Sequence, residues 1–111
     1  MISELAKKEC KPCDGGTPVL KGDALREMIN KLGDSGWNVL EEKRLEKKFR
    51  FPDFRLALDF VNRVGAVAEE QGHHPNICFT WGEATLQIWT HKVDGLTESD
   101  FILAAKINQL D

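Results

Sequence analysis

Several features that mark common protein classes are missing from this sequence of 111 residues. No apolar run approaches the roughly 20 residues that a membrane-spanning helix needs, and residues 1–8 lack the apolar segment of a secretory signal. Charged residues make up 30% of the chain, they are interleaved, and the formal net charge is only -3, so nothing favours a phosphate backbone as partner. We therefore expect a cytoplasmic protein with no membrane and no nucleic acid among its partners.

Cysteine is scarce, and the three that occur, Cys10, Cys13 and Cys78, do not resemble the dense framework of a small secreted domain. Reduced thiols are expected. Cys10 and Cys13 form a Cys-x-x-Cys pair that could be half a zinc site or a redox couple, but no second Cys pair or His-x-x-x-His element completes four ligands. A structural or incidental pair is the preferred interpretation. A phosphate-binding glycine loop, a nucleophile elbow and a zinc-protease helix are also missing.

What the chain does contain is enough apolar sequence, 41% of residues, to bury a single core. Residues 1–21 are rich in Lys, Pro and Gly and show neither helical nor strand periodicity, which predicts an irregular amino-terminal arm. From Gly22 the pattern changes. We expect one domain over residues 22–111.

Hydrophobic periodicity predicts three helices and two hairpins in this domain. The helices are expected at 22–32, 53–71 and 97–110, and the strands at 36–40, 45–51, 76–80 and 84–89. Gly33 and Gly72 are placed to end the first two helices, and Asp53 to cap the start of the second. The apolar stripe of that second helix is expected to contain Phe54, Ala57, Leu58, Val61, Val64 and Ala68.

The order α-β-β-α-β-β-α predicts an α+β fold in which three helices pack on one face of a four-stranded antiparallel sheet. The last helix opens with Thr97-Glu98-Ser99-Asp100, a capping-box-like start with Asp in place of Glu. Between Phe101 and Leu110 it is apolar over more than one stripe. We expect that its own sheet covers one side and another subunit the other, which predicts a homo-oligomer.

All three histidines of the chain are expected at one end of the second hairpin. With a turn centred on Gly82, residues whose numbers sum to about 164 face one another, so that His73 falls opposite His91. His74 lies next to His73, and Glu69 lies one helical turn earlier. Imidazoles change protonation state near neutral pH, and a pair of them could act as acid and base in one turnover.

Other interpretations of these residues stay open at this point. One histidine could cap a helix, another could pair with a carboxylate and the third could simply be exposed. A metal site of His73, His74, His91 and Glu69 is possible by residue type, although neighbouring side chains on an extended segment point apart. Three tryptophans could offer a flat face to a heteroaromatic ring, or simply pack in the core; they are Trp37, Trp81 and Trp89.

The sequence resembles the pterin-4a-carbinolamine dehydratases, a family whose animal members double as dimerisation cofactors of a homeodomain transcription factor. The resemblance is carried by Glu69-x-x-x-His73-His74-Pro75, by Trp89-Thr90-His91, and by Gly95-Leu96-Thr97-x-x-Asp100 followed by Leu103-Ala104. Together with Gly36-Trp37 and the helix from Asp53, it spans about residues 20–110. The ordered set at these spacings is specific to the family.

The resemblance implies a hydro-lyase that dehydrates 4a-hydroxytetrahydropterin, the product of aromatic amino-acid hydroxylases, to the quinonoid dihydropterin during tetrahydrobiopterin recycling. It implies no metal and no organic cofactor, dimers that join their sheets, and tetramers that pack helices. By position, His73 and His91 would transfer protons, His74 would hold the pterin and assist, and Glu69 would orient or polarise the site. Further contacts to the substrate would come from Trp81, Trp89 and Thr90.

Two departures from the family pattern concern the rim of the pterin site. Gly72 stands where animal members have an acidic residue, and Trp81-Gly82 stands where many members have Tyr-Asn. The amino-terminal Cys10-x-x-Cys13 arm resembles bacterial members. The alternative function is a pterin-binding or protein-interaction module without catalysis, either an accessory of molybdenum-cofactor metabolism or a dimerisation cofactor.

Overall fold

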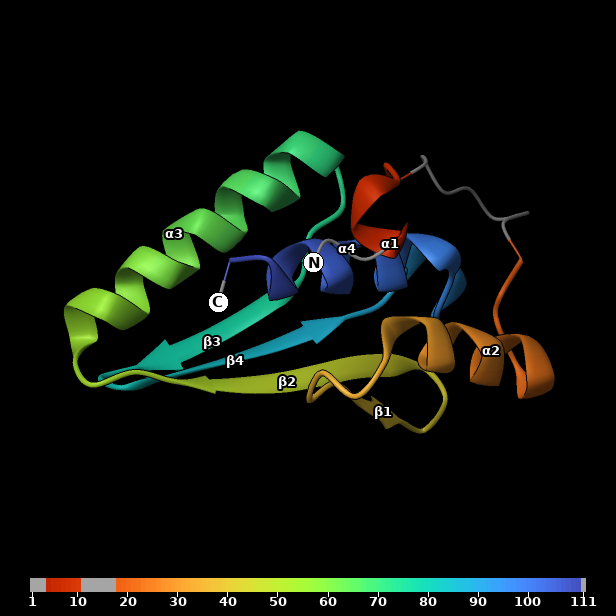
Figure 1. The fold of residues 1–111 in the computed structure, drawn as a ribbon, viewed down its shortest axis with the longest axis horizontal. Helices are drawn as coiled ribbons and strands as arrows, with labels where there is room; N and C mark the ends of the chain where they lie inside the picture. Colours follow the sequence, from red (N-terminus) through yellow and green to blue (C-terminus); the bar gives the residue numbers. More distant parts are fainter. Residues whose placement is uncertain (1–3, 11–17, 111) are drawn as a thin grey trace.

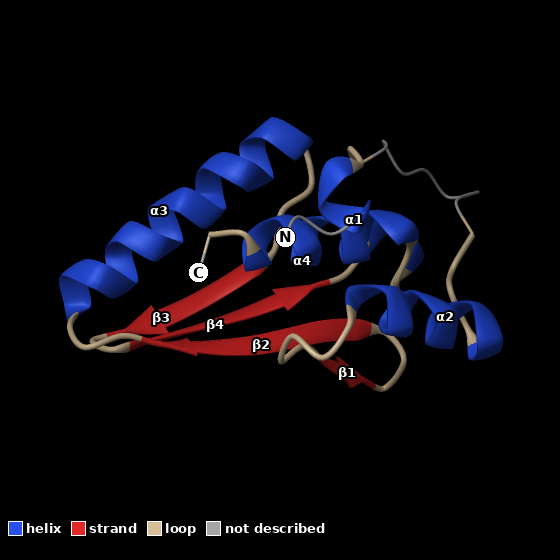
Figure 2. Cartoon of the chain, in the orientation of Figure 1, coloured by secondary structure: helices blue, strands red, loops and turns tan. Residues whose placement is uncertain are grey.

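The structure is a computed structural model that describes residues 4–10 and 18–110. Four antiparallel strands form one sheet in the order β1-β2-β4-β3, and the helices lie together on one face of it (Figures 1 and 2). The elements are α1 (Glu4–Lys7), α2 (Gly22–Leu32), β1 (Asn38–Leu40), β2 (Arg44–Arg50), α3 (Phe54–Gln71), β3 (Asn76–Thr80), β4 (Glu83–Ile88), the 3-10 turn η1 (His91–Val93) and α4 (Glu98–Asn108). The α+β class and the order of the three long helices and four strands are confirmed.

The β3–β4 hairpin differs from the predicted register by one residue. Ile77 pairs with Leu86 and Thr80 pairs with Glu83, so that Trp81 and Gly82 form a two-residue turn. The backbone N–H of Phe51 donates to the carbonyl oxygen of Gly82 at 2.8 Å. A Cβ at Gly82 would lie 2.8 Å from the carbonyl oxygen of Phe51. The close approach of the two backbones therefore requires glycine at this position.

Helix α3 begins and ends where the sequence predicts. An Asp53 carboxylate oxygen accepts from the backbone N–H of Leu56 at 2.9 Å, and Gly72 ends the helix in the left-handed conformation with φ 65°. The predicted stripe is wrong in part, because Phe54 and Leu58 are exposed. Phe60, which the predicted stripe omits, is fully buried beside Phe49.

Helix α4 is the most enclosed helix, since nearly every residue from Ser99 to Ile107 is buried. Helices α1, α2 and α3 all pack against it, and the buried apolar cluster joins it to the sheet. Its apolar breadth is therefore satisfied inside one protomer. The prediction that another subunit covers this helix loses its support. The predicted capping box is confirmed, because the backbone N–H of Thr97 donates to Oδ2 of Asp100 at 2.8 Å.

The amino-terminal arm is not irregular throughout. Residues 4–7 form the short helix α1, and Leu5 and Ala6 are buried against α4. Lys106 of α4 donates its Nζ to the carbonyl oxygen of Ala6 at 2.8 Å. A single helical turn is too short to show a periodicity, so its docking could not be predicted from the pattern. Of the Cys-x-x-Cys pair, Cys10 is half-buried with its Sγ 3.4 Å from the carbonyl oxygen of Ser99, while Cys13 lies outside the described residues.

Membrane insertion was not expected, and among the described residues no helix has both the length and the apolar character needed to span a bilayer.

The turn between β1 and β2 generates a prediction about stability. Glu41 and Glu42 both have positive φ, 52° and 59°, and the turn is closed by the Lys43 N–H donating to the Leu40 carbonyl oxygen at 2.9 Å. Most residues with a Cβ are disfavoured in this conformation. Gly, which has no Cβ, and Asn, whose short polar side chain can hydrogen-bond to the local backbone, are preferred. The double change Glu41→Asn with Glu42→Gly should raise the free energy of unfolding by about 1 kcal/mol. This is the net gain, from which the loss caused by the greater entropy of Gly in the unfolded chain has been subtracted. Urea unfolding measures it.

The control is Glu41→Ala with Glu42→Ala, which removes the same two charges but introduces neither of the two residues that favour the left-handed conformation. It should not stabilise the protein. If the Ala pair stabilises as much as the Asn-Gly pair, charge and not backbone conformation is responsible.

Candidate functional site

Three segments that are distant in sequence meet at one end of the sheet: the end of α3, the end of β4 and the start of α4 (Figure 1). Gly72 stops α3, and the backbone N–H of His73 still donates to the carbonyl oxygen of Ala68 at 3.2 Å. The chain therefore turns sharply enough to aim His73 at the start of α4. Each histidine has a different partner there.

His73 is bound to a buried carboxylate. Its Nε2 lies 2.5 Å from Oδ1 of Asp100, which is fully buried, while 13% of the His73 side chain is exposed. The second oxygen of Asp100, Oδ2, accepts from the Thr90 hydroxyl and from the Thr97 backbone N–H, both at 2.8 Å. Asp100 therefore receives hydrogen bonds at both oxygens, as a buried carboxylate requires.

This contact determines which nitrogen of His73 is available for chemistry. A carboxylate only accepts hydrogen bonds, so Nε2 of a neutral His73 must carry the proton that it shares with Asp100. The lone pair is then on Nδ1. His73 can take up a proton at Nδ1 while the carboxylate holds the ring in place.

His74 has a different environment. Its Nε2 lies 2.5 Å from a carboxylate oxygen of Glu69, and the two side chains are 58% and 80% exposed. The pair is open to solvent, so water screens it and it contributes little to stability. The sequence placed Glu69 one turn before the histidines, and the structure brings it to His74. Glu69 can orient His74 but does not touch the buried network.

His91 begins the turn η1 and is exposed. Its ring stacks on that of Trp89 with centroids 4.3 Å apart and an interplanar angle of 21°. The guanidinium of Arg44 also lies over the Trp89 ring, 4.3 Å from the centroid. Arg44 and Lys43 pair with Asp94, at 3.3 and 3.5 Å, in the loop that follows His91. An aromatic and cationic stack, rather than a carboxylate, therefore holds His91.

The structure changes several expectations for individual residues. His73 does not face His91 across the ladder, because pairing of β3 with β4 begins at Asn76 and Gln87. Trp81 is 65% exposed in the turn at the opposite end of the hairpin, so one chain does not bring it to the histidines. Thr90 is buried with its hydroxyl on Asp100, which removes the side chain from the surface where a substrate would bind. Trp89 contacts Arg44 and His91.

Asp100 is the site residue that sequence reasoning missed. It was assigned only to the capping box of α4, and it also belongs to the motif that carries the family resemblance. A capping carboxylate has two oxygens, of which the backbone N–H of Thr97 uses one. A signal was therefore present: a fully buried acidic residue needs more partners than a cap supplies.

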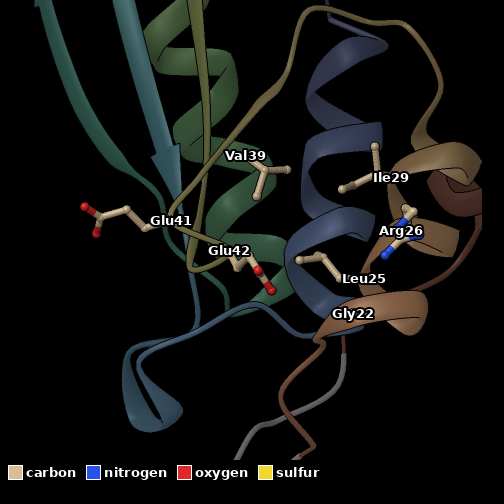
Figure 3. Close-up of a pocket in the computed structure, with 7 residues that line it drawn as sticks. All are labelled: Gly22, Leu25, Arg26, Ile29, Val39, Glu41 and Glu42. Carbon is tan, nitrogen blue, oxygen red and sulfur yellow. The ribbon is translucent and has the colours of Figure 1, made fainter.

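The alternative of a metal site is not assembled by the described residues, which contain no group of three or more His, Cys, Asp or Glu side chains arranged to hold an ion. A cavity of about 400 Å³ lies elsewhere, between α2 and the β1–β2 turn (Figure 3). Leu25, Ile29 and Val39 form its apolar part, and the side chain of Glu41 points away from them. None of the three histidines lines this cavity, so we do not include it in the candidate site.

Comparison with known proteins identifies one family. The model of the family described as pterin 4 alpha carbinolamine dehydratase matches residues 18–110. A protein of Rubrobacter xylanophilus, named as a candidate pterin-4-alpha-carbinolamine dehydratase, is 59% identical over 109 residues, which cover 98% of this chain and 100% of the relative. A protein of Rickettsia bellii with the same kind of name is 47% identical over 106 residues, covering 96% and 93%.

Two solved structures are similar to this chain. One is described as a transcriptional coactivator/pterin dehydratase from Brucella melitensis, with a TM-score of 0.75, 26% identity, and coverage of 84% of this chain and 98% of the other. The second is a pterin dehydratase-like protein described as a RuBisCO assembly factor in the alpha-carboxysome, with a TM-score of 0.59, 25% identity, and coverage of 68% and 88%.

The contacts of Asp94 generate a prediction about pH. Lys43 lowers the pKa of Asp94 below its usual 3.8, chiefly through its charge, and hydrogen bonds from Arg44 and Lys43 act in the same direction. The contribution of these contacts to the stability of the folded protein is therefore complete above about pH 3.8. It is lost as the pH falls through the lowered pKa of Asp94. Lys43→Gln should raise the pKa of Asp94 toward 3.8, as measured by carbon-13 NMR titration of the carboxyl group.

The matched control is Lys48→Gln, which removes a lysine of β2 that pairs with Glu83 instead. It should leave the pKa of Asp94 unchanged. An equal rise in both variants would mean that overall charge, and not the Lys43 contact, sets the pKa.

Proposed function

Because the chain belongs to the pterin 4 alpha carbinolamine dehydratase family, we propose that it dehydrates a 4a-hydroxytetrahydropterin to the quinonoid dihydropterin. This is a hydro-lyase reaction, and it serves the recycling of tetrahydrobiopterin-type cofactors. The observation that carries the proposal is the hydrogen bond from His73 to the buried carboxylate of Asp100. It occupies Nε2 and leaves Nδ1 as the nitrogen of His73 that can exchange a proton.

The reaction needs two proton transfers and no change of oxidation state. A general acid protonates the hydroxyl on C4a, the carbon–oxygen bond breaks, and water leaves. The adjacent ring nitrogen supplies the electron pair that forms the new double bond and loses its proton to a general base. One proton is delivered and one is removed, so the acid ends deprotonated and the base ends protonated. Return of that proton from the base to the acid, through solvent, restores both groups for the next turnover.

His73 and His91 are the proton-transfer groups in this proposal. Asp100 holds His73 through Nε2 and leaves Nδ1 for the substrate. The stack on Trp89 holds His91, which follows Thr90 in the chain, and the Thr90 hydroxyl binds the same carboxylate. His91 lies on the surface, where the leaving water can escape. The two groups have different environments, one against a carboxylate and one against an aromatic ring that also contacts a guanidinium.

His74 and Glu69 hold and orient the pterin. Their pairing at 2.5 Å directs Nε2 of His74 toward Glu69 and leaves Nδ1 for the substrate. The exposure of both side chains fits a role at the mouth of the site. Trp81, at the far end of the hairpin, could contact a pterin only in another subunit.

The edge of the sheet supports a homodimer. β3 is an edge strand of five residues without charge, and Asn76, Cys78 and Thr80 are exposed along it. An uncharged edge of this length can pair with a second copy of itself. The exposed apolar residues Phe54, Leu56 and Leu58 of α3 offer a further surface for a tetramer. We place the protein in the cytoplasm and propose an aromatic amino-acid hydroxylase as the source of its substrate.

A second function stands beside this one. The similar structure described as a RuBisCO assembly factor is of the same fold and carries a function in assembly. A protein of this fold can therefore act as an interaction module, which is the second candidate function for this chain. The pairing of His74 with Glu69 favours the enzyme, because it is exposed, contributes little to stability and has no evident use in a pure scaffold.

Substitution of the histidines tests the proposed function. His73→Ala and His91→Ala should each lower turnover of freshly generated 4a-hydroxytetrahydropterin by about 10²- to 10⁴-fold, because each removes one proton-transfer group. The double variant should lose more than either. His74→Ala should weaken substrate binding as well as turnover, and Glu69→Gln should have a smaller effect. Steady-state kinetics provide the measurement.

Each variant is checked for a wild-type circular dichroism spectrum and for its mass by sedimentation at micromolar concentration, which also reports whether the wild-type protein is a dimer. A monomeric wild-type protein would contradict the proposed homodimer. Near-wild-type turnover in both His73→Ala and His91→Ala would refute the acid–base assignment and favour the interaction module.

A further inference from the structure

Thr90 is a polar side chain placed in the core. It lies two residues after the end of β4, it is only 3% exposed, and its hydroxyl has two partners. Oγ1 of Thr90 donates to Oδ2 of Asp100 at 2.8 Å and lies 3.0 Å from Oγ1 of Thr97. Since the Thr90 proton is used on Asp100, Thr97 is the donor between the two hydroxyls.

Packing alone does not explain a hydroxyl at this position. The preceding inward residues of β4, Ala84, Leu86 and Ile88, are apolar and fully buried. Valine has nearly the shape of threonine and would continue that row without a buried polar atom to satisfy. The role of the hydroxyl is therefore to bind the carboxylate of Asp100.

The Thr90 hydroxyl restricts the orientation of that carboxylate. Without it, Oδ2 would keep one donor, the Thr97 backbone N–H, and Oδ1 would keep His73. One donor at each oxygen still permits tilting of the carboxylate plane. Two donors on Oδ2, one from the end of β4 and one from the start of α4, fix the plane and direct Oδ1 to Nε2 of His73.

Thr90 is also tied to the loop of His91 through its backbone. Its N–H donates to the carbonyl oxygen of Gly95 at 2.9 Å, and its own carbonyl accepts from Gly95 and Val93. These bonds do not involve the side chain. Replacing the hydroxyl therefore changes the His73 branch of the site and leaves the His91 loop in place, so His91 serves as an internal control.

We propose that the Thr90 hydroxyl is a positioning group that, through Asp100, holds His73 in the tautomer with its proton on Nε2 and thereby makes Nδ1 the atom that exchanges a proton with the substrate. Only one part of this inference rests on the proposed function, namely that His73 takes part in proton transfer. The tautomer itself is a property of the free protein. The inference reassigns Thr90 from substrate contact to control of a catalytic group that it does not touch.

The experiment compares Thr90→Val, which keeps the shape and removes the hydroxyl, with Thr90→Ser, which keeps the hydroxyl. Long-range proton–nitrogen-15 correlation NMR of the free, labelled protein at about pH 8, above the ordinary imidazole pKa of about 6.5, reports the tautomer of each histidine. We expect the Nε2–H form of His73 in the wild type and in Thr90→Ser, and a mixture of tautomers in Thr90→Val. The His91 signals should stay the same in all three.

Turnover should fall roughly 10-fold in Thr90→Val, as expected for loss of one hydrogen bond to a charged group, with little change in KM. Thr90→Ser should restore most of it. Thr85→Val is the matched control. Thr85 is a threonine of β4 that lies between the buried residues Ala84 and Leu86 and does not belong to the Asp100 network. It should change neither the His73 tautomer nor turnover.

A wild-type tautomer pattern and wild-type turnover in folded Thr90→Val would overturn the proposal. So would a wild-type protein in which His73 carries its proton on Nδ1, a result that needs no variant. If Thr90→Val does not fold, Thr90→Ala takes its place with the same expectations. Should the wild type show no dehydration while Thr90→Val still shifts the His73 tautomer, the proposed function fails and the positioning role of Thr90 stands.

Discussion

The buried carboxylate of Asp100 is the interaction on which the rest of the site depends. It lies at the start of α4, fully enclosed, and it collects donors from three segments: His73 after α3, Thr90 after β4, and the backbone of Thr97. A carboxylate in such a place is costly unless both oxygens are satisfied. The three segments must therefore come together for the fold to form, and the same requirement places His73.

One residue thus has a structural and a chemical role. As the capping residue of α4, Asp100 satisfies a backbone N–H that the helix cannot satisfy itself. As the partner of His73, it sets the tautomer of an imidazole at the surface of the core. Helix α4 is held on its other sides by α1, α2 and α3, so its start is a rigid base for the carboxylate. Rigid support of this kind is what a proton-transfer group needs.

The sequence predicted the elements of the fold well because strong local signals mark them. Asp53 and Gly72 bound α3, and Thr97 with Asp100 opens α4. It predicted less well where long-range contacts decide. Phe60 is buried against Phe49 of β2, the single turn of α1 docks on α4, and the neighbouring helices enclose α4 inside one protomer. The β3–β4 register differs by one residue, because the turn is formed by Trp81 and Gly82 together and is not centred on Gly82.

For the site, the sequence predicted the three histidines as candidates but not what holds each of them in place. The proximity of Glu69 to the histidines follows from helical spacing. The Asp100 contact joins residues 27 positions apart, and the Arg44 contact joins β2 to Trp89, the residue after β4. Such pairings depend on how α4 and β2 lie against the rest of the sheet. Composition and periodicity do not contain that information.

The most direct test of the central claim is the turnover of Asp100→Asn, which keeps the size of the side chain and removes its charge. An amide presents a donor as well as an acceptor, so it cannot satisfy His73, Thr90 and the Thr97 backbone in the same way. The control is Asp23→Asn, at an exposed carboxylate of α2. The account predicts that folded Asp100→Asn loses about 10²-fold or more of the dehydratase turnover while Asp23→Asn keeps it. Wild-type turnover in folded Asp100→Asn would contradict it.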